Sequence, residues 1–134
     1  MGIKYEKAHD IAFLARRIVF KLEWKHVDLA NVGFIRSHGS QARRTIARCH
    51  TIGKAIQVAL DRKGYYMIEV LSEQFDKLSF EDKVKTIIHE LMHIPRAFGG
   101  GFIHHNEVNE RNVRQMYQKY LASDKKDLEE YGIF

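Results

Sequence analysis

Residues 79–95, SFEDKVKTIIHELMHIP, constrain the fold more than any other part of this 134-residue chain. Ser79 is a good N-cap, and two carboxylates follow it in the first turn, where they favour the helix dipole. Pro95 disfavours helical geometry at the preceding residue, so the helix should end close to His93. Between these limits, helical spacing gives an apolar face made of Val84, Ile87, Ile88 and Leu91. The segment therefore predicts one amphipathic helix.

The same helix carries two histidines on one side. His89 and His93 are one helical turn apart, so their imidazoles project in the same direction and can bind one cation. Imidazole nitrogen suits Zn²⁺ well. Glu90 flanks the pair, and from there its carboxylate can take a proton from a water molecule on the metal, as in the H-E-x-x-H motif. We therefore predict that His89 and His93 bind zinc and that Glu90 is the general base.

A third zinc ligand has to come from another part of the chain, since catalytic zinc usually has three protein ligands. Three glycines, Gly99–Gly101, follow the predicted helix and allow the chain to turn back. Either His104 or His105 can then reach the metal, and only one of these adjacent side chains should bind. Carboxylate ligands from the following segment stay open as alternatives, namely Glu107 and Glu110. The metzincin spacing fails, because the chain has Arg96 and Gly99 where that motif has glycine and histidine.

The remaining segments predict an α+β domain. A long amphipathic helix is expected over residues 4–24 and a last helix over residues 107–122. Short apolar runs predict a strand over Val32–Arg36. Alternation and β-forming residues predict two or three strands with short connections in residues 42–71, the last of them YYMIEVL at 65–71. Residues 41–60 stay open between strand and helix, since Ala and Arg also suit helices. We expect a small, mostly antiparallel sheet packed against the N-terminal helix and the histidine-bearing helix, with a C-terminal helix added.

Composition limits the classes of protein that the chain can represent. Its length suits a single domain over residues 1–134, and 45% hydrophobic residues with 29% charged residues are typical of a globular protein. No apolar run approaches a membrane span, and Cys49 is the single cysteine, so a cytoplasmic protein without membrane association is expected. The net charge is +5, and basic residues gather at Arg36, Arg43, Arg44 and Arg48. Such a cluster can bind phosphate, and we therefore consider weak association with nucleic acid.

Two stretches resemble a known family. IEVLSEQFDKLSFEDKVKTIIHELMHIPRAFGGGFIHH and IRSHGSQARRTIAR are similar to the small, zincin-like predicted metallopeptidases of archaea and phages. The most specific part is HELMHIP followed by FGGG and a histidine. The resemblance implies a zincin-like fold, His89 and His93 as zinc ligands, and Glu90 as the general base. The family's later histidine aligns best with His105.

These observations lead to one functional hypothesis and one alternative. The first is a zinc-dependent metallopeptidase that acts on peptides or proteins. The alternative is a zinc-containing nucleic-acid-associated or regulatory binding protein without protease activity. In zincins generally, an edge strand beside the active-site helix binds the substrate backbone. Residues 65–71 are the candidate for that strand here, unless they form an ordinary strand of the sheet.

Overall fold

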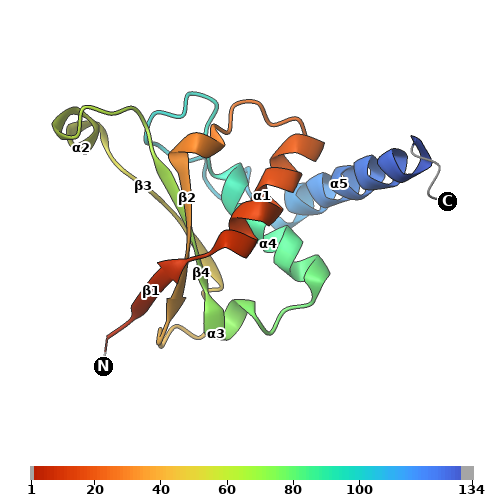
Figure 1. Cartoon of the computed structure of the whole chain (residues 1–134), viewed down its shortest axis with the longest axis horizontal. Coiled ribbons are helices and arrows are strands. Elements are labelled where there is room, and N and C mark those ends of the chain that lie inside the picture. Colours follow the sequence, from red (N-terminus) through yellow and green to blue (C-terminus); the bar gives the residue numbers. More distant parts are fainter. Residues whose placement is uncertain (1, 131–134) are drawn as a thin grey trace.

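Figure 1 shows a computed structural model of the chain, which describes residues 2–130 and side chains up to residue 123. A four-stranded sheet has helices α1 and α4 on one face, and helix α5 packs against both of them. The helices are α1 (His9–Lys21), α2 (Lys54–Ala59), α3 (Ser72–Phe75), α4 (Phe80–Met92) and α5 (Glu110–Glu130), with a short 3-10 helix at Leu29–Asn31.

The sheet is mixed, with strand order β1-β2-β4-β3. The strands are β1 (Lys4–Lys7), β2 (Val32–His38), β3 (Ala47–Thr51) and β4 (Tyr66–Leu71). The pairs β1-β2 and β3-β4 are antiparallel, and the central pair β2-β4 is parallel. The α+β class is thus confirmed, and antiparallel pairs outnumber the parallel one.

The N-terminal prediction was wrong at its beginning. A helix was expected over residues 4–24, but residues 4–7 form β1 and the helix begins at His9. All four residues of β1 are exposed, so burial of their side chains does not stabilise the strand. Pairing with β2 stabilises it, because β2 supplies backbone hydrogen-bond partners. The pairing sets Glu6 opposite Arg36, and the Glu6 carboxylate lies 2.9 Å from the His38 ring. Such a contact between distant segments cannot be read from local periodicity.

The prediction of two or three strands in residues 42–71 was confirmed, because β3 and β4 form there and pair antiparallel. Within residues 41–60, where the assignment was left open, β3 is followed by the short helix α2. The alternation over Ala55–Val58 that favoured a strand lies inside this helix. Its single buried residue is Gln57, so a helix of this length presents no apolar stripe that a sequence pattern could detect.

The strand expected at an edge lies in the interior of the sheet. β4 has β2 on one side and β3 on the other, so residues 66–71 have no free edge for a substrate. The near-continuous burial of β4 is typical of a strand covered on both faces. The edge strand next to α4 is β3.

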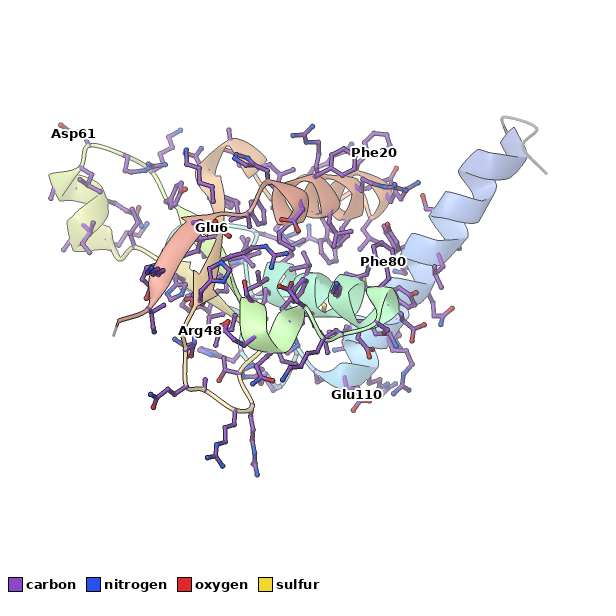
Figure 2. All side chains as sticks on the ribbon, turned by 60° about the horizontal axis from the view of Figure 1, so that its bottom comes forward. Glu6, Phe20, Arg48, Asp61, Phe80 and Glu110 are labelled. Carbon is purple, nitrogen blue, oxygen red and sulfur yellow. The ribbon has the colours of Figure 1, made fainter. Side chains whose placement is uncertain are left out.

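Helices α1 and α4 build most of the core together with β4. Side chains fill the space between these helices and the sheet (Figure 2). The predicted cap of α4 is present, because the Ser79 hydroxyl accepts a hydrogen bond of 3.2 Å from the amide of Asp82. The apolar face predicted for this helix is completely buried, as is shown by Val84, Ile87, Ile88 and Leu91. Among residues 2–130, no helix is long and apolar enough to cross a membrane.

Truncation of the core face of α4 should be costly. Ile87 is 0% exposed, and Ile87→Ala should lower the free energy of unfolding by about 2–5 kcal/mol, through lost burial and an internal cavity. Ile56 on α2 is 51% exposed, and Ile56→Ala should change it by less than about 0.5 kcal/mol. Urea denaturation of the two variants measures both values. Equal effects of the two substitutions would contradict the assignment of the core.

Candidate metal centre

Three histidines meet at the end of α4. The ligand nitrogens of His89, His93 and His105 all lie within 4.8 Å of one another. The ring centroids of His89 and His93 are 5.0 Å apart, and the His105 ring lies 5.5 Å from the first and 4.8 Å from the second. The rings of His89 and His93 lie on one side of the helix because these residues are four positions apart. The His105 ring comes from the chain that follows the glycines. His104 is exposed and stands outside this group.

The glycine segment allows the third histidine to return. Gly100 has a φ of +103°, and a Cβ atom at this position would lie 2.7 Å from both the Gln57 side chain and the carbonyl oxygen of Ile52. Both the backbone conformation and the space therefore require glycine here. The chain then reaches Ile103, whose amide donates a hydrogen bond of 2.9 Å to the carbonyl of His93. His105 is two residues farther on.

A second hydrogen bond orients the His93 ring. Its Nδ1 atom lies 2.6 Å from the carbonyl oxygen of Ile103, and since a carbonyl only accepts, Nδ1 carries the proton. In the neutral ring, Nε2 then keeps its lone pair for a metal ion. A backbone carbonyl behind a histidine is a common way in which proteins fix the tautomer of a metal ligand.

The environment keeps these imidazoles neutral. Burial, together with the nearby rings of His93 and His105, lowers the pKa of His89 to about 4. Burial also lowers the pKa of His93, and the hydrogen bond to Ile103 only partly opposes this effect. A metal ligand must be deprotonated, so both residues are ready to bind at neutral pH.

The cluster fits a tetrahedral metal ion. Ligand nitrogens on one tetrahedral zinc ion lie about 3.3 Å apart. Since no two of the three nitrogens are more than 4.8 Å apart, each pair has to approach by at most about 1.5 Å, which is within the reach of side-chain rotations. The residues present therefore suit a metal centre with three nitrogen ligands.

Glu90 faces the same site from a buried position. Glu90 is only 7% exposed, and burial raises the pKa of its carboxyl group to about 7. It lines a cavity of about 310 Å³ together with His93, His105 and Cys49. Burial and the neighbouring Glu90 raise the pKa of the Cys49 thiol to about 12, so this cysteine stays protonated and is a poor metal ligand. A carboxyl group with a pKa near neutrality can both accept and donate a proton.

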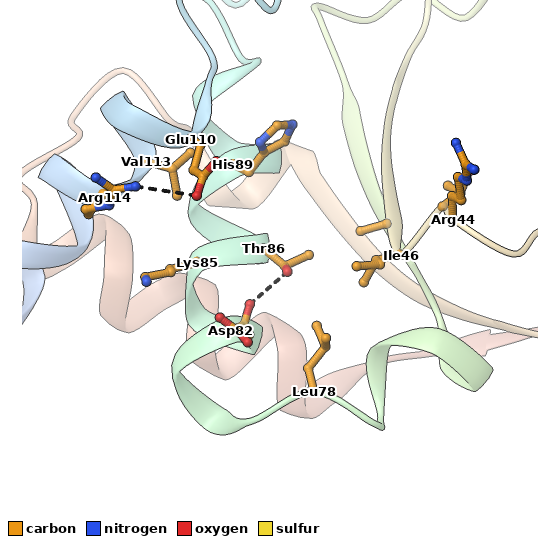
Figure 3. A pocket seen from close by; sticks show the side chains of 12 residues that line it. Arg44, Ile46, Leu78, Asp82, Lys85, Thr86, His89, Glu110, Val113 and Arg114 are labelled. Atoms are coloured by element: carbon orange, nitrogen blue, oxygen red, sulfur yellow. Dashed lines mark hydrogen bonds and ion pairs between the residues drawn. The ribbon is translucent and has the colours of Figure 1, made fainter.

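A larger cavity lies on the other side of the cluster. Its volume is about 620 Å³, and it borders on His89 (Figure 3). Ile46 and Leu78 face Thr86 of α4 across this space, and Val113 of α5 closes another side. Ala47, at the beginning of the edge strand, lines both cavities. β3 therefore runs along a groove that passes the three histidines. This role of β3 was not predicted, because residues 65–71 were the candidate for the substrate-binding edge strand.

The alternative carboxylate ligands, Glu107 and Glu110, are not part of the histidine group. Glu110 borders the larger cavity but is highly exposed and contacts Arg114 at 3.4 Å, and Glu107 lines a separate cavity beside Arg96.

The four arginines of the predicted basic cluster fall into two groups. Arg36 is bound by the carboxylates of Asp10 and Asp76, each at 2.7 Å. Arg43, Arg44 and Arg48 are exposed, and side chains of the connection between β2 and β3 project away from the rest of the molecule (Figure 2). Their association with nucleic acid stays a prediction.

Comparison with known proteins gives one match. A sequence model of the family described as "Putative phage metallopeptidase" matches residues 3–130. This range takes in every strand and helix described above, including the histidine cluster. Comparisons with curated proteins and with solved structures gave no match.

The buried carboxyl group should make the metal-free protein sensitive to pH. Glu90 has an ordinary pKa of 4.5 and a pKa of about 7 in the folded chain. The folded state therefore keeps a proton that the unfolded state has released, and the free energy of unfolding falls as pH rises from 4.5 to about 7. Glu90→Gln removes this loss, so above pH 7 the variant should be more stable than the wild type by about 3 kcal/mol.

Urea denaturation of metal-free protein across this pH range measures the difference. His89 titrates in both proteins, so its contribution cancels in the comparison. Glu110→Gln is the matched control, since the Glu110 side chain is 91% exposed and its replacement should change the free energy of unfolding by less than about 0.5 kcal/mol. A gap between Glu90→Gln and the wild type that stays constant over the range would show that Glu90 is not buried as described.

Proposed function

Because the chain belongs to the phage metallopeptidase family, we propose that it is a zinc-dependent metallopeptidase that hydrolyses peptide bonds. The observation that carries the proposal is the convergence of His89, His93 and His105, whose ligand nitrogens lie within 4.8 Å of one another. The buried carboxyl group of Glu90 beside them supports hydrolysis, because this reaction needs a base at the metal centre.

The donor set favours zinc and a catalytic site. Imidazole suits zinc better than it suits magnesium or calcium, which prefer oxygen ligands. Three protein ligands leave one tetrahedral position open, whereas structural zinc sites normally have four. Among the side chains of residues 2–123, His89, His93 and His105 form a group of three possible metal ligands. His104 lines the smaller cavity with the cluster, and there it can contact a bound substrate.

Glu90 is the proton carrier in the proposed reaction. When bound, zinc supplies positive charge that polarises the scissile carbonyl and lowers the pKa of the attacking water. Glu90 accepts a proton from this water as the water oxygen bonds to the carbonyl carbon. The protonated carboxyl group then donates the proton to the amide nitrogen as the carbon–nitrogen bond breaks. Glu90 ends the cycle as a carboxylate, so no further acid is needed.

The edge strand offers a way to hold the substrate. β3 has one paired side, against β4, and its other side borders the groove past the histidines. An extended peptide that adds to this edge would cross the metal centre, with alternate side chains directed into the groove. The wall of the larger cavity beside His89 contains apolar side chains such as Ile46 and charged ones such as Asp82 and Lys85, so a peptide side chain directed there would meet both kinds of group.

The alternative function, a regulatory or nucleic-acid-associated protein that keeps zinc for structure, predicts a different coordination. It needs a fourth protein ligand and should unfold when zinc is removed. The three-histidine group of the described residues favours the catalytic reading.

Substitution of the proposed base separates metal binding from catalysis. Glu90→Gln should keep one zinc ion per chain and lower peptide hydrolysis by about 10²–10⁴-fold, since the amide cannot accept the proton. Elemental analysis measures the zinc, and cleavage of a mixed peptide library followed by mass spectrometry measures the hydrolysis. Glu6→Gln, at an exposed position on β1, the opposite edge of the sheet from β3, should leave both unchanged. Full hydrolysis by zinc-loaded Glu90→Gln protein would refute the role of Glu90.

A further inference from the structure

The loop between the two parts of the metal centre wraps around one tyrosine ring. Tyr66 comes from β4, in the middle of the sheet, and is 0% exposed. Its ring meets the rings of Phe98 and Phe102 edge-on, with centroids 4.8 Å and 6.1 Å away. These two phenylalanines flank the three glycines. The segment 98–102 therefore encloses Tyr66 from two sides.

The hydroxyl group of Tyr66 binds the backbone of this loop twice. It accepts a hydrogen bond of 3.0 Å from the amide of Gly100 and donates one of 2.7 Å to the carbonyl of Gly101. Both capacities of the hydroxyl are thus used on consecutive glycines. A segment of three glycines has large conformational freedom, so these two bonds fix a conformation that its own sequence leaves open.

Gln57 also binds this loop. Its side-chain amide donates hydrogen bonds of 3.0 Å to the carbonyls of Gly99 and Ile52. Gln57 is 7% exposed and is the one buried residue of α2. A buried glutamine with its donors on two carbonyls is costly to replace, because each carbonyl would lose its partner. Together, Tyr66 and Gln57 bind all three glycines of the loop.

The position of the loop is passed on to the metal centre. Ile103 follows the enclosed segment directly, and its amide and carbonyl both bond to His93. His105 is reached two residues later. The glycine loop is therefore anchored on the sheet at one end and on the histidine helix at the other, and His105 follows from both anchors.

We propose that Tyr66 and Gln57 are positioning residues of the metal centre, which place His105 for metal binding through their hydrogen bonds to Gly99–Gly101. The proposal rests on the proposed function, since it takes the three histidines as the metal ligands. Neither side chain contacts the metal or the substrate in this role. Tyr66 is fixed in the sheet and binds the loop from there. The short helix α2 has no apolar face, and in this proposal its role is to carry Gln57.

The test compares two tyrosines that are adjacent in the sequence. Tyr66→Phe removes only the hydroxyl, and should weaken zinc binding by about 10-fold, the lower end of the range for partners that orient metal ligands. Tyr65→Phe is the matched control, because the Tyr65 ring lies under Arg62 and its hydroxyl faces Gly33, away from the loop. Its zinc affinity should equal that of the wild type. Competition with a chromophoric chelator measures the zinc dissociation constants of the full chain.

A second pair repeats the test at the other anchor. Gln57→Ala should weaken zinc binding to a similar degree. Gln74→Ala is the control, since Gln74 also donates to a backbone carbonyl, that of Ala42, but in another loop. The second pair keeps the proposal testable should Tyr66→Phe protein fail to fold.

A double-mutant cycle separates positioning from general support of the fold. If Tyr66 acts through His105, then Tyr66→Phe should weaken zinc binding by less than about 2-fold in a chain that already carries His105→Ala. Cobalt-substituted Tyr66→Phe protein should also show a visible spectrum that differs from the wild type in the direction of His105→Ala. A loss of folding stability alone would produce neither result.

The outcomes distinguish the two proposals. Wild-type affinity in both Tyr66→Phe and Gln57→Ala, or equal effects of Tyr66→Phe with and without His105, would overturn the positioning role and leave the metal centre standing. Absence of zinc binding by the wild type would overturn the proposed function, and the positioning role with it.

Discussion

The hydrogen-bonded contact between His93 and Ile103 is the interaction on which the site depends. The amide of Ile103 binds the carbonyl at the end of α4, and the carbonyl of Ile103 accepts from the ring of the same histidine. One residue thus binds the carbonyl at the end of the helix, fixes the tautomer of the His93 ring and holds the returning chain, which carries His105, beside the helix. Without this contact, His89 and His93 would still share a helix face, but His105 would have no defined place beside them.

The fold supplies rigid supports around this contact. α4 is buried along its apolar face, and the sheet carries Tyr66 beneath the returning loop. The same burial makes the site costly to maintain, since it raises the pKa of Glu90 and lowers the pKa of His89. Groups whose pKa values are displaced in a cleft are common at catalytic centres, because proton transfer needs a group that titrates near the working pH. Burial of Glu90 lowers the stability of the fold, and the same burial gives its carboxyl group the pKa that the proposed proton transfer needs.

Local patterns in the sequence predicted the elements that depend on neighbouring residues. Ser79 and Pro95 set the limits of α4, and the spacing of His89 and His93 placed both rings on one side of it. The choice between His104 and His105 was left to the resemblance with a family, because adjacent side chains in a loop differ only through contacts made elsewhere. The structure brings His105 into the group with the two helix histidines.

Contacts between distant segments decided the rest. The strand β1 exists because β2 lies beside it, and the order of β3 and β4 follows from pairings that no single strand specifies. One signal was present, however, because the sequence of β4 is apolar except for Glu69, and such a nearly continuous apolar run is typical of an interior strand. The helix α2 is shorter than two turns, so helical and strand periodicity cannot be told apart in it. Its contribution, the contact of Gln57 with the glycine loop, is visible only in three dimensions.

X-ray absorption spectroscopy of the zinc-loaded chain tests the central claim most directly, because it reports the number and kind of atoms bound to the metal. The account predicts three imidazole nitrogens and one oxygen from water at about 2.0–2.1 Å. A sulfur neighbour at about 2.3 Å, or a fourth imidazole in place of the water oxygen, would contradict a catalytic centre built from His89, His93 and His105.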